Sequence, residues 1–186
     1  MTDSANADSA AFPTLWAEPL TAAVFVPFGS VVDGSGPGRA VNEGRALRHG
    51  GVAGLVHDTG AVAPVLAVYA ISASAWPVAT SEFERHRRSA QLFVPMAGEG
   101  LLAVVAPDGA DGGPDVARAR AFVVPAGTGI VYAPGTWHVP LVALGAAARC
   151  AMLMWETGTA EDCEVWRLPA PLRVLPPHDD GAEQGD

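Results

Sequence analysis

The feature that most constrains this chain is the regular alternation of short apolar segments with turns built from glycine, proline and aspartate. Such turn residues favour a positive or a fixed φ. Short strands at this spacing are typical of an antiparallel barrel or sandwich. The expected strands are Val24–Phe28, Val65–Ser72, Gln91–Met96, Leu101–Ala106, Ala121–Pro125, Gly129–Ala133, Val139–Leu144, Arg149–Trp155 and Glu164–Leu168. We therefore predict an all-β fold, an antiparallel β-barrel with a few short peripheral helices, one of them at Leu15–Ala23.

The length of 186 residues suits one domain with a real core. Residues 1–11 are small and polar, so we expect a flexible N-terminus. Residues 176–186 are acidic and lack an apolar anchor, so we expect a disordered tail. The sequence thus predicts a single β-barrel domain over residues 12–175.

Charge and composition exclude several classes of partner. The formal net charge is −9, and the densest basic cluster, Arg85 with Arg87 and Arg88, stands beside glutamates, which excludes a nucleic-acid interface. No apolar run reaches the roughly 18 residues that a membrane span needs. Two cysteines, Cys150 and Cys163, and an N-terminus without a secretory signal predict reduced thiols and a cytoplasmic location.

Two short segments could carry chemistry. Glu84 and His86 stand at i and i+2, so on a strand both side chains would enter the barrel. Gln91 and His138, on neighbouring strands, could complete the set. The two segments resemble the two motifs of cupins, with Glu84-Arg85-His86 where cupins place His-x-His. Imidazole and carboxylate suit a divalent transition metal such as Ni, Zn or Mn, although glutamine is a weak ligand and one imidazole is missing. A metal held by Glu84, His86, Gln91 and His138 is therefore allowed but not required.

Several motifs in the same order resemble the ureidoglycolate lyase family, which is cupin-like. The first is Glu84-Arg85-His86 followed by Gln91-Leu92-Phe93-Val94-Pro95-Met96, against the family's Leu-Glu-Arg-His and Gln-x-Phe-x-Pro-Met. The other matching segments are 42–44 with 48–49, 114–115 with 119–122, 127–132, 137–141 and 162–164. Each motif is short, but together they run from about residue 20 to about residue 170.

The resemblance implies a carbon–nitrogen lyase that splits ureidoglycolate into glyoxylate and urea in allantoin and purine degradation. It implies a small carboxylate substrate and a homodimer. His138 would act as general base or acid, because an imidazole titrates near neutral pH. Glu84 and His86 would hold a metal or shuttle a proton directly.

The remaining expected site residues would bind the substrate. Arg48, or Arg85 if it faces inward, would bind the carboxylate through a bidentate fork. Strand alternation, however, points Arg85 outward. Tyr132 and Gln91 would orient the ureido group. Asn42 would contact the substrate or would only make an Asx turn before Gly44.

Departures from the family's pattern leave the exact substrate open. Arg88, Ser89 and Ala90 stand where the family usually has Leu-Gly-Ser/Thr, Val139 replaces a histidine and Ser74 replaces an arginine. One alternative is a cupin-type lyase or isomerase acting on another small hydroxy or amino acid. Others are a metal-dependent cupin dioxygenase or sugar isomerase, against which the missing His-x-His argues, and a non-catalytic sensor of a small anion.

Overall fold

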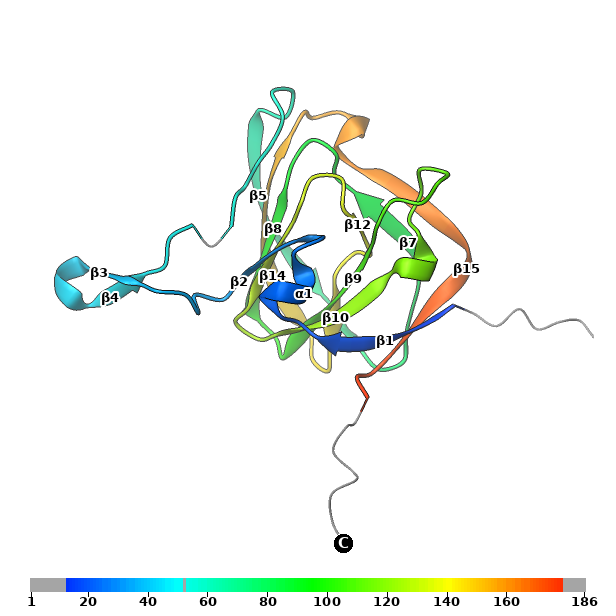
Figure 1. Cartoon of the computed structure of the whole chain (residues 1–186), viewed down its shortest axis with the longest axis horizontal. Helices are drawn as coiled ribbons and strands as arrows, with labels where there is room; N and C mark the ends of the chain where they lie inside the picture. The colour runs from blue at the N-terminus through cyan, green and yellow to red at the C-terminus, as the bar shows by residue number, and fades with distance from the viewer. Residues whose placement is uncertain (1–12, 52, 179–186) are drawn as a thin grey trace, which may run out of the picture.

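The computed structural model describes residues 13–51 and 53–178. The expected flexible segment 1–11 and most of the expected tail lie outside the described residues. Within them, strands dominate, together with one short α-helix and three 3₁₀ turns. The prediction of an all-β barrel with few peripheral helices is therefore confirmed (Figure 1).

The larger sheet closes on itself. Its strands follow the order β10-β1-β15-β7-β12-β9-β13-β6, and β9 also pairs with β10, so that six of them form a ring. Their bounds are β1 Thr14–Pro19, β6 Ala73–Ser74, β7 Val78–Arg85, β9 Gly100–Ala106, β10 Arg120–Pro125, β12 Trp137–His138, β13 Val142–Leu144 and β15 Glu164–Leu175. Most pairs are antiparallel as predicted, but β1 is parallel to both β10 and β15, and β13 is parallel to β6. The wholly antiparallel expectation is wrong there because β1 inserts between two strands that already share a direction.

A second sheet of five strands packs against the first. Its order is β2-β11-β8-β14-β5, with β2 and β5 at the edges. The bounds are β2 Gly29–Val32, β5 Ala63–Ile71, β8 Gln91–Ala97, β11 Gly129–Tyr132 and β14 Ala148–Glu156. Inward side chains such as Phe93 and Met152 meet Leu101, Val105 and Phe122 from the larger sheet in one buried cluster. Burial of this apolar surface between the two sheets is the main stabilising contribution to the fold.

The N-terminal segment differs from the prediction. The expected helix Leu15–Ala23 is wrong, because Thr14–Pro19 form β1 and the helix α1 spans only Ala22–Phe25. The expected strand Val24–Phe28 is wrong as well. Phe25 and Phe28 instead pack against Phe122 in the core, with ring centroids 5.5 and 6.3 Å away. Tertiary contacts of two aromatic side chains decide the local conformation here.

A two-stranded hairpin projects from the barrel on the side of the five-stranded sheet (Figure 1). It consists of β3 Arg39–Val41, the 3₁₀ turn η1 Asn42–Gly44 and β4 Ala46–Arg48. We call residues 39–48 the arm. The other 3₁₀ turns are η2 Val116–Arg118 and η3 Ala160–Asp162.

Two further expectations concern the chain end and membranes. His178, which we assigned to the tail, stacks on Trp16 of β1 with ring centroids 3.8 Å apart. The chain therefore packs on the barrel as far as residue 178. The composition of the tail did not indicate this stacking contact. Across residues 13–51 and 53–178, no helix is long and apolar enough to span a bilayer.

Candidate active site

Glu84, His86 and His138 meet at one end of the barrel. Glu84 lies on β7 one residue before its end, His86 directly follows β7, and His138 is paired with Glu84 across β12. One ligand atom from each residue lies within 4.8 Å of the others. A single ion or substrate oxygen placed between them can therefore contact all three side chains. The predicted i, i+2 arrangement of Glu84 and His86 holds in the structure.

Backbone carbonyl groups orient both imidazoles. His86 Nδ1 lies 2.6 Å from the carbonyl oxygen of Asp162, and His138 Nδ1 lies 2.9 Å from that of Thr136. Because a carbonyl can only accept, both Nδ1 atoms must carry the proton and donate it. The lone pairs of the neutral rings then lie on the two Nε2 atoms, which are buried without a hydrogen-bond partner. These are the two free bases of the site.

The carboxylate of Glu84 is held between the imidazoles and a thiol. Glu84 Oε1 lies 3.4 Å from His138 Nε2, a contact too long for a good hydrogen bond, and Cys163 Sγ donates to Oε2 over 3.7 Å. Burial raises the pKa of Glu84, but contacts with His138, His86 and Cys163 outweigh it, so the pKa lies below its usual value. Burial lowers the pKa of His86. Glu84 is thus ionised and His86 neutral at neutral pH.

A cavity of about 210 Å³ opens beside these groups. It is lined by Tyr69, Glu84, His86, Gln91, Met152, Met154, Glu156, Asp162 and Cys163. Gln91 donates through Nε2 to Met154 Sδ over 3.6 Å and leaves its Oε1 buried without a partner. The structure therefore brings Gln91 to the site, as predicted. His138 is 1% exposed and lies deeper, outside the cavity wall.

The donor set fits a divalent metal ion. His138 Nε2 lies 3.4 Å from Glu84 Oε1, so a proton or a cation placed between the two atoms would be stabilised by both. Two imidazole nitrogens and a carboxylate oxygen are ligands that Zn, Ni and Mn accept. The structure shows this candidate cluster at Glu84, His86 and His138, and Gln91 Oε1 is the one further donor that our prediction named.

Tyr132 belongs to the same neighbourhood. Its ring stacks on His138 with centroids 4.2 Å apart, and its hydroxyl group is buried without a partner. Burial raises the pKa of Tyr132 strongly, so the phenol stays protonated. It can therefore donate one hydrogen bond to a ligand.

Arg85 points away from the cavity, as strand alternation indicated. Its guanidinium group lies 4.0 Å from the centroid of the Trp137 ring and donates to Glu164, to Asp108 and to the carbonyl of Gly112. All of its nitrogen atoms are engaged within the barrel wall. The structure thus gives Arg85 a structural role and does not place it at the site.

Arg48 and Asn42 lie on the arm, and neither is among the residues that line the cavity. Asn42 has φ 54° and Glu43 has φ 58°, so the tip of the arm is a tight turn with two residues in the left-handed region. Within one chain, the structure does not bring these two predicted substrate ligands to Glu84, His86 and His138.

The departures from the family's pattern lie outside the cavity wall. Arg88 pairs with Asp58 and Glu161, while the Ser89 hydroxyl donates to the carbonyl of Ala90 and accepts from the amide of Trp155. Val139 is buried in a second apolar cluster, and Ser74 lies on β6. These replacements alter packing around the site and do not change the side chains that face the cavity.

Six of the nine residues in the cavity wall had no predicted role: Tyr69, Met152, Met154, Glu156, Asp162 and Cys163. Met152, Met154 and Glu156 share one face of β14 through period-two alternation, a signal that was present in the sequence. Asp162 and Cys163 stood in a matching motif without an assigned role. Burial, and the nearby negative charge of Glu84, raise the pKa of Cys163 to about 11, which argues against a thiolate nucleophile.

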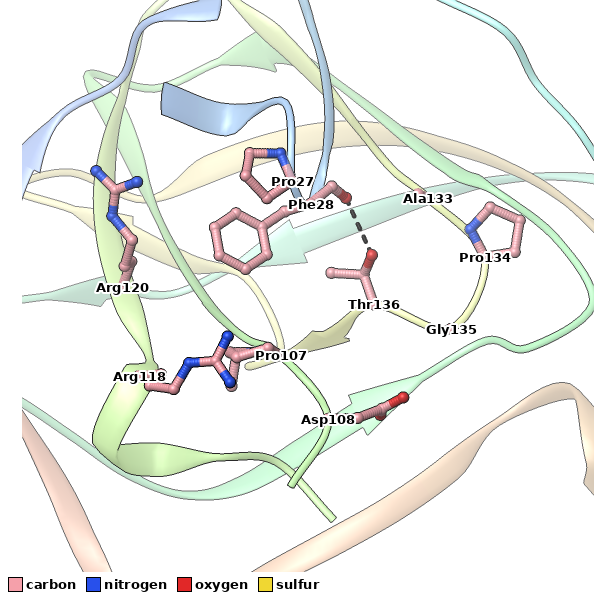
Figure 2. Close-up of a pocket in the computed structure, with 11 residues that line it drawn as sticks. Pro27, Phe28, Pro107, Asp108, Arg118, Arg120, Ala133, Pro134, Gly135 and Thr136 are labelled. Carbon is pink, nitrogen blue, oxygen red and sulfur yellow. Dashed lines mark hydrogen bonds between the residues drawn. The ribbon is translucent and has the colours of Figure 1, made fainter. Parts of the chain in front are cut away.

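A larger cavity of about 430 Å³ lies elsewhere on the surface. Figure 2 shows Arg118 and Arg120 on one side of it and the turn 133–136 on the other. Arg120 is held by Glu18 through two hydrogen bonds, and Thr136 donates to the carbonyl of Phe28. This cavity contains neither of the site imidazoles, so size does not mark the candidate active site here.

Fold and site together define a small β-barrel enzyme with a carboxylate and two imidazoles at one end of the barrel. The chain belongs to the ureidoglycolate lyase family, whose sequence profile matches residues 12–175.

The chain is also similar to individual proteins of this family and, more weakly, to solved structures. A ureidoglycolate lyase of Rhodobacter capsulatus is 36% identical over 161 residues, covering 86% of this chain and 97% of that protein. One of Burkholderia mallei is 37% identical over 134 residues, covering 71% and 76%. A dTDP-4-dehydrorhamnose 3,5-epimerase from Elizabethkingia anophelis aligns with a TM-score of 0.36 and 10% identity over 55% of this chain and 54% of that one. The similarity to the epimerase is too low to indicate a shared fold or function.

Proposed function

We propose that this chain is a ureidoglycolate lyase that releases glyoxylate and urea. The observation that carries the proposal is the convergence of three buried polar atoms without partners, His86 Nε2, His138 Nε2 and Gln91 Oε1, around Glu84 in a member of this family. Buried polar atoms are normally satisfied, so a cluster of unsatisfied ones indicates a ligand. The relatives give no support to the alternative of a dioxygenase or sugar isomerase.

The reaction needs one proton to move from oxygen to nitrogen. His138 Nε2 takes the proton of the carbinol hydroxyl, and the oxygen electron pair forms the carbonyl of glyoxylate as the carbon–nitrogen bond breaks. The leaving nitrogen then takes the same proton back from the pair of His138 and Glu84. No water or covalent nucleophile is consumed. A positioned acid–base group of this kind contributes roughly 10²–10⁴-fold to the rate.

The other side chains bind and orient the substrate. Gln91 Oε1 can accept from an N–H of the ureido group, and the hydroxyl of Tyr132 can donate to it. His86 Nε2, with its lone pair directed toward the site, and Glu84 would hold a divalent ion, which leaves His138 Nε2 free as the base. A divalent ion bound there would polarise the hydroxyl group and favour loss of its proton.

The proposal includes a cytoplasmic location and a homodimer. Both cysteines are free, as expected in a reducing compartment. A small-molecule carboxylate is the proposed substrate, and its anionic group requires a cation that the cavity wall lacks.

The test is to incubate the purified protein with ureidoglycolate and to measure glyoxylate and urea separately. We expect both products in equal amounts above the spontaneous rate. His138→Ala should abolish turnover without unfolding the chain, whereas His178→Ala, remote from the cavity, should leave it intact. Absence of urea above background contradicts the proposal, and ammonia with carbon dioxide in its place would indicate a hydrolase.

A further inference from the structure

The wall of the candidate active site has no arginine or lysine side chain to pair with the substrate carboxylate. This wall contains Glu84, Glu156 and Asp162 but no arginine, and the chain has no lysine. Arg85, Arg87 and Arg88, the nearest in sequence, are each paired with acidic side chains. Binding of a small carboxylate in an acidic cavity without a positive group is electrostatically unfavourable.

The arm carries two more positive than negative side chains. Three of the eleven basic residues lie within residues 39–48, but only one of the twenty acidic residues does. Arg39 and Arg48 are direct cross-strand partners, and among the described residues no acidic side chain pairs with either. Like charges placed opposite one another destabilise a hairpin. An anion held between the two guanidinium groups would remove this repulsion.

The arm is also poorly supported by its own chain. β3 and β4 pair only with each other, and Leu47 on the arm is 65% exposed. An isolated two-stranded hairpin is marginally stable in water. The left-handed conformations of Asn42 and Glu43 add strain. A hairpin of this kind needs a surface to pack against.

Such a surface lies on the outer face of the five-stranded sheet. Two cross-strand rows, Leu66–Leu153–Leu92 and Val68–Ala151–Val94, run over β5, β14 and β8. Leu66 is 73% exposed and Val68 60%, and Met96 on the same sheet is 62% exposed. A contiguous exposed apolar patch of this kind marks an interaction site.

The arm, the apolar face and the cavity lie on the same part of the molecule. The arm projects from the side of the barrel formed by the five-stranded sheet (Figure 1). The same sheet supplies Tyr69, Gln91, Met152, Met154 and Glu156 to the cavity wall. In a dimer that forms through this face about a two-fold axis, each arm projects toward the other copy.

We propose that two copies of the chain associate through the outer face of the five-stranded sheet, and that the arm of each copy delivers Arg39 and Arg48 to the cavity of the other. There the paired guanidinium groups bind the substrate carboxylate. The identity of the anion rests on the proposed function, but the interface and the position of the arm do not. The basic arm and the acidic cavity are complementary in charge, and the partner is therefore a second copy of this chain.

Subunit complementation tests the position of the arm. We expect Arg39→Ala/Arg48→Ala to lower kcat/KM by at least about tenfold, since charge-assisted hydrogen bonds to the carboxylate are lost. Arg45→Ala, on the same arm but paired with Glu43, is the matched control and should retain activity. A heterodimer of the double variant with His138→Ala, isolated through two tags, has one complete site and should show about half of wild-type activity. No recovery in this heterodimer, or full activity of the double variant alone, would overturn the proposal.

Two measurements test the interface without reference to the substrate. Sedimentation should show a wild-type dimer and a monomer for Leu66→Glu/Val68→Glu, whereas Val26→Glu, at an exposed valine directly after α1, should stay dimeric. Hydrogen exchange of residues 39–48 should be slow in the dimer and fast in the monomeric variant. An arm that exchanges freely in a dimeric wild type, or a wild type that is monomeric, refutes the proposal. If the wild type releases no urea while these results hold, the assigned reaction fails and the interface stands.

Discussion

The phenol ring of Tyr132 lies nearly flat on the imidazole of His138, with centroids 4.2 Å apart and an angle of 17° between the planes. Tyr132 comes from β11 of the five-stranded sheet and His138 from β12 of the closed ring. Together with the hydrogen bond to the carbonyl of Thr136, the stacking fixes the direction of His138 Nε2. The contact therefore links the packing of the two sheets to the chemistry of the site.

Replacements at Tyr132 should separate its ring from its hydroxyl group. Tyr132→Phe keeps the stacking and removes a buried, unpartnered hydroxyl, so the free energy of unfolding should stay equal or rise, while KM rises if the hydroxyl contacts the substrate. Tyr132→Ala should lower kcat and destabilise the fold by about 3–5 kcal/mol, by analogy with other large-to-small aromatic replacements. Urea denaturation and steady-state kinetics measure both effects. Equal losses of kcat in the two variants would contradict a positioning role for the ring.

Metal content should depend on the three clustered side chains. We expect the purified protein to contain a divalent transition metal that is lost on Glu84→Gln or His86→Asn and kept on Glu156→Gln, a nearby carboxylate outside the cluster. Elemental analysis measures this directly, and chelation should lower turnover until Zn, Ni or Mn is restored. Full activity of metal-free protein would show that Glu84 and His138 move the proton alone.

Arg85 should matter for stability and not for substrate binding. Arg85→Ala removes the hydrogen bonds to Glu164 and Asp108 and the contact with Trp137, which should cost about 1.5–3 kcal/mol, since both carboxylates left behind reach solvent. Arg118→Ala breaks only an exposed pair with Asp115 and should cost less than about 1 kcal/mol. Denaturant unfolding measures the difference. A variant at Arg85 that keeps full stability but raises KM would place its guanidinium group at the site after all.

The two thiols should both be alkylated slowly, Cys163 in the folded protein and Cys150 only after unfolding. Burial raises the pKa of Cys150 to about 11, and its side chain is inaccessible in the native chain. Cys163 is exposed, and its raised pKa keeps most of the thiol protonated at neutral pH. Because the thiolate is the reactive form, modification at Cys163 should keep accelerating as the pH rises past 9, where an ordinary thiol levels off. Mass spectrometry after alkylation should find Cys150 labelled only in denaturant, and rapid labelling of Cys163 at neutral pH would be contrary evidence.

The sequence by itself determined which side of a strand each site residue occupies. Alternation with period two placed Glu84 and His86 on one side of the chain at the end of β7 and Arg85 on the other, and it located most of the strands within a few residues. The family motifs added the identity of the site, since they combine the segment around Glu84 with the one around His138. These signals are local, and they act over a few residues of backbone.

Tertiary structure alone decided which segments meet. His138 pairs with Glu84, and the carbonyl of Asp162 orients His86, although these positions lie far apart in the chain. The stacking of Tyr132 on His138 joins strands of two different sheets. Strand register and loop placement depend on non-local packing, which periodicity does not encode. For the same reason, the motif that contains Asn42 and Arg48 predicted substrate contacts but could not reveal that both lie on a hairpin outside their own barrel.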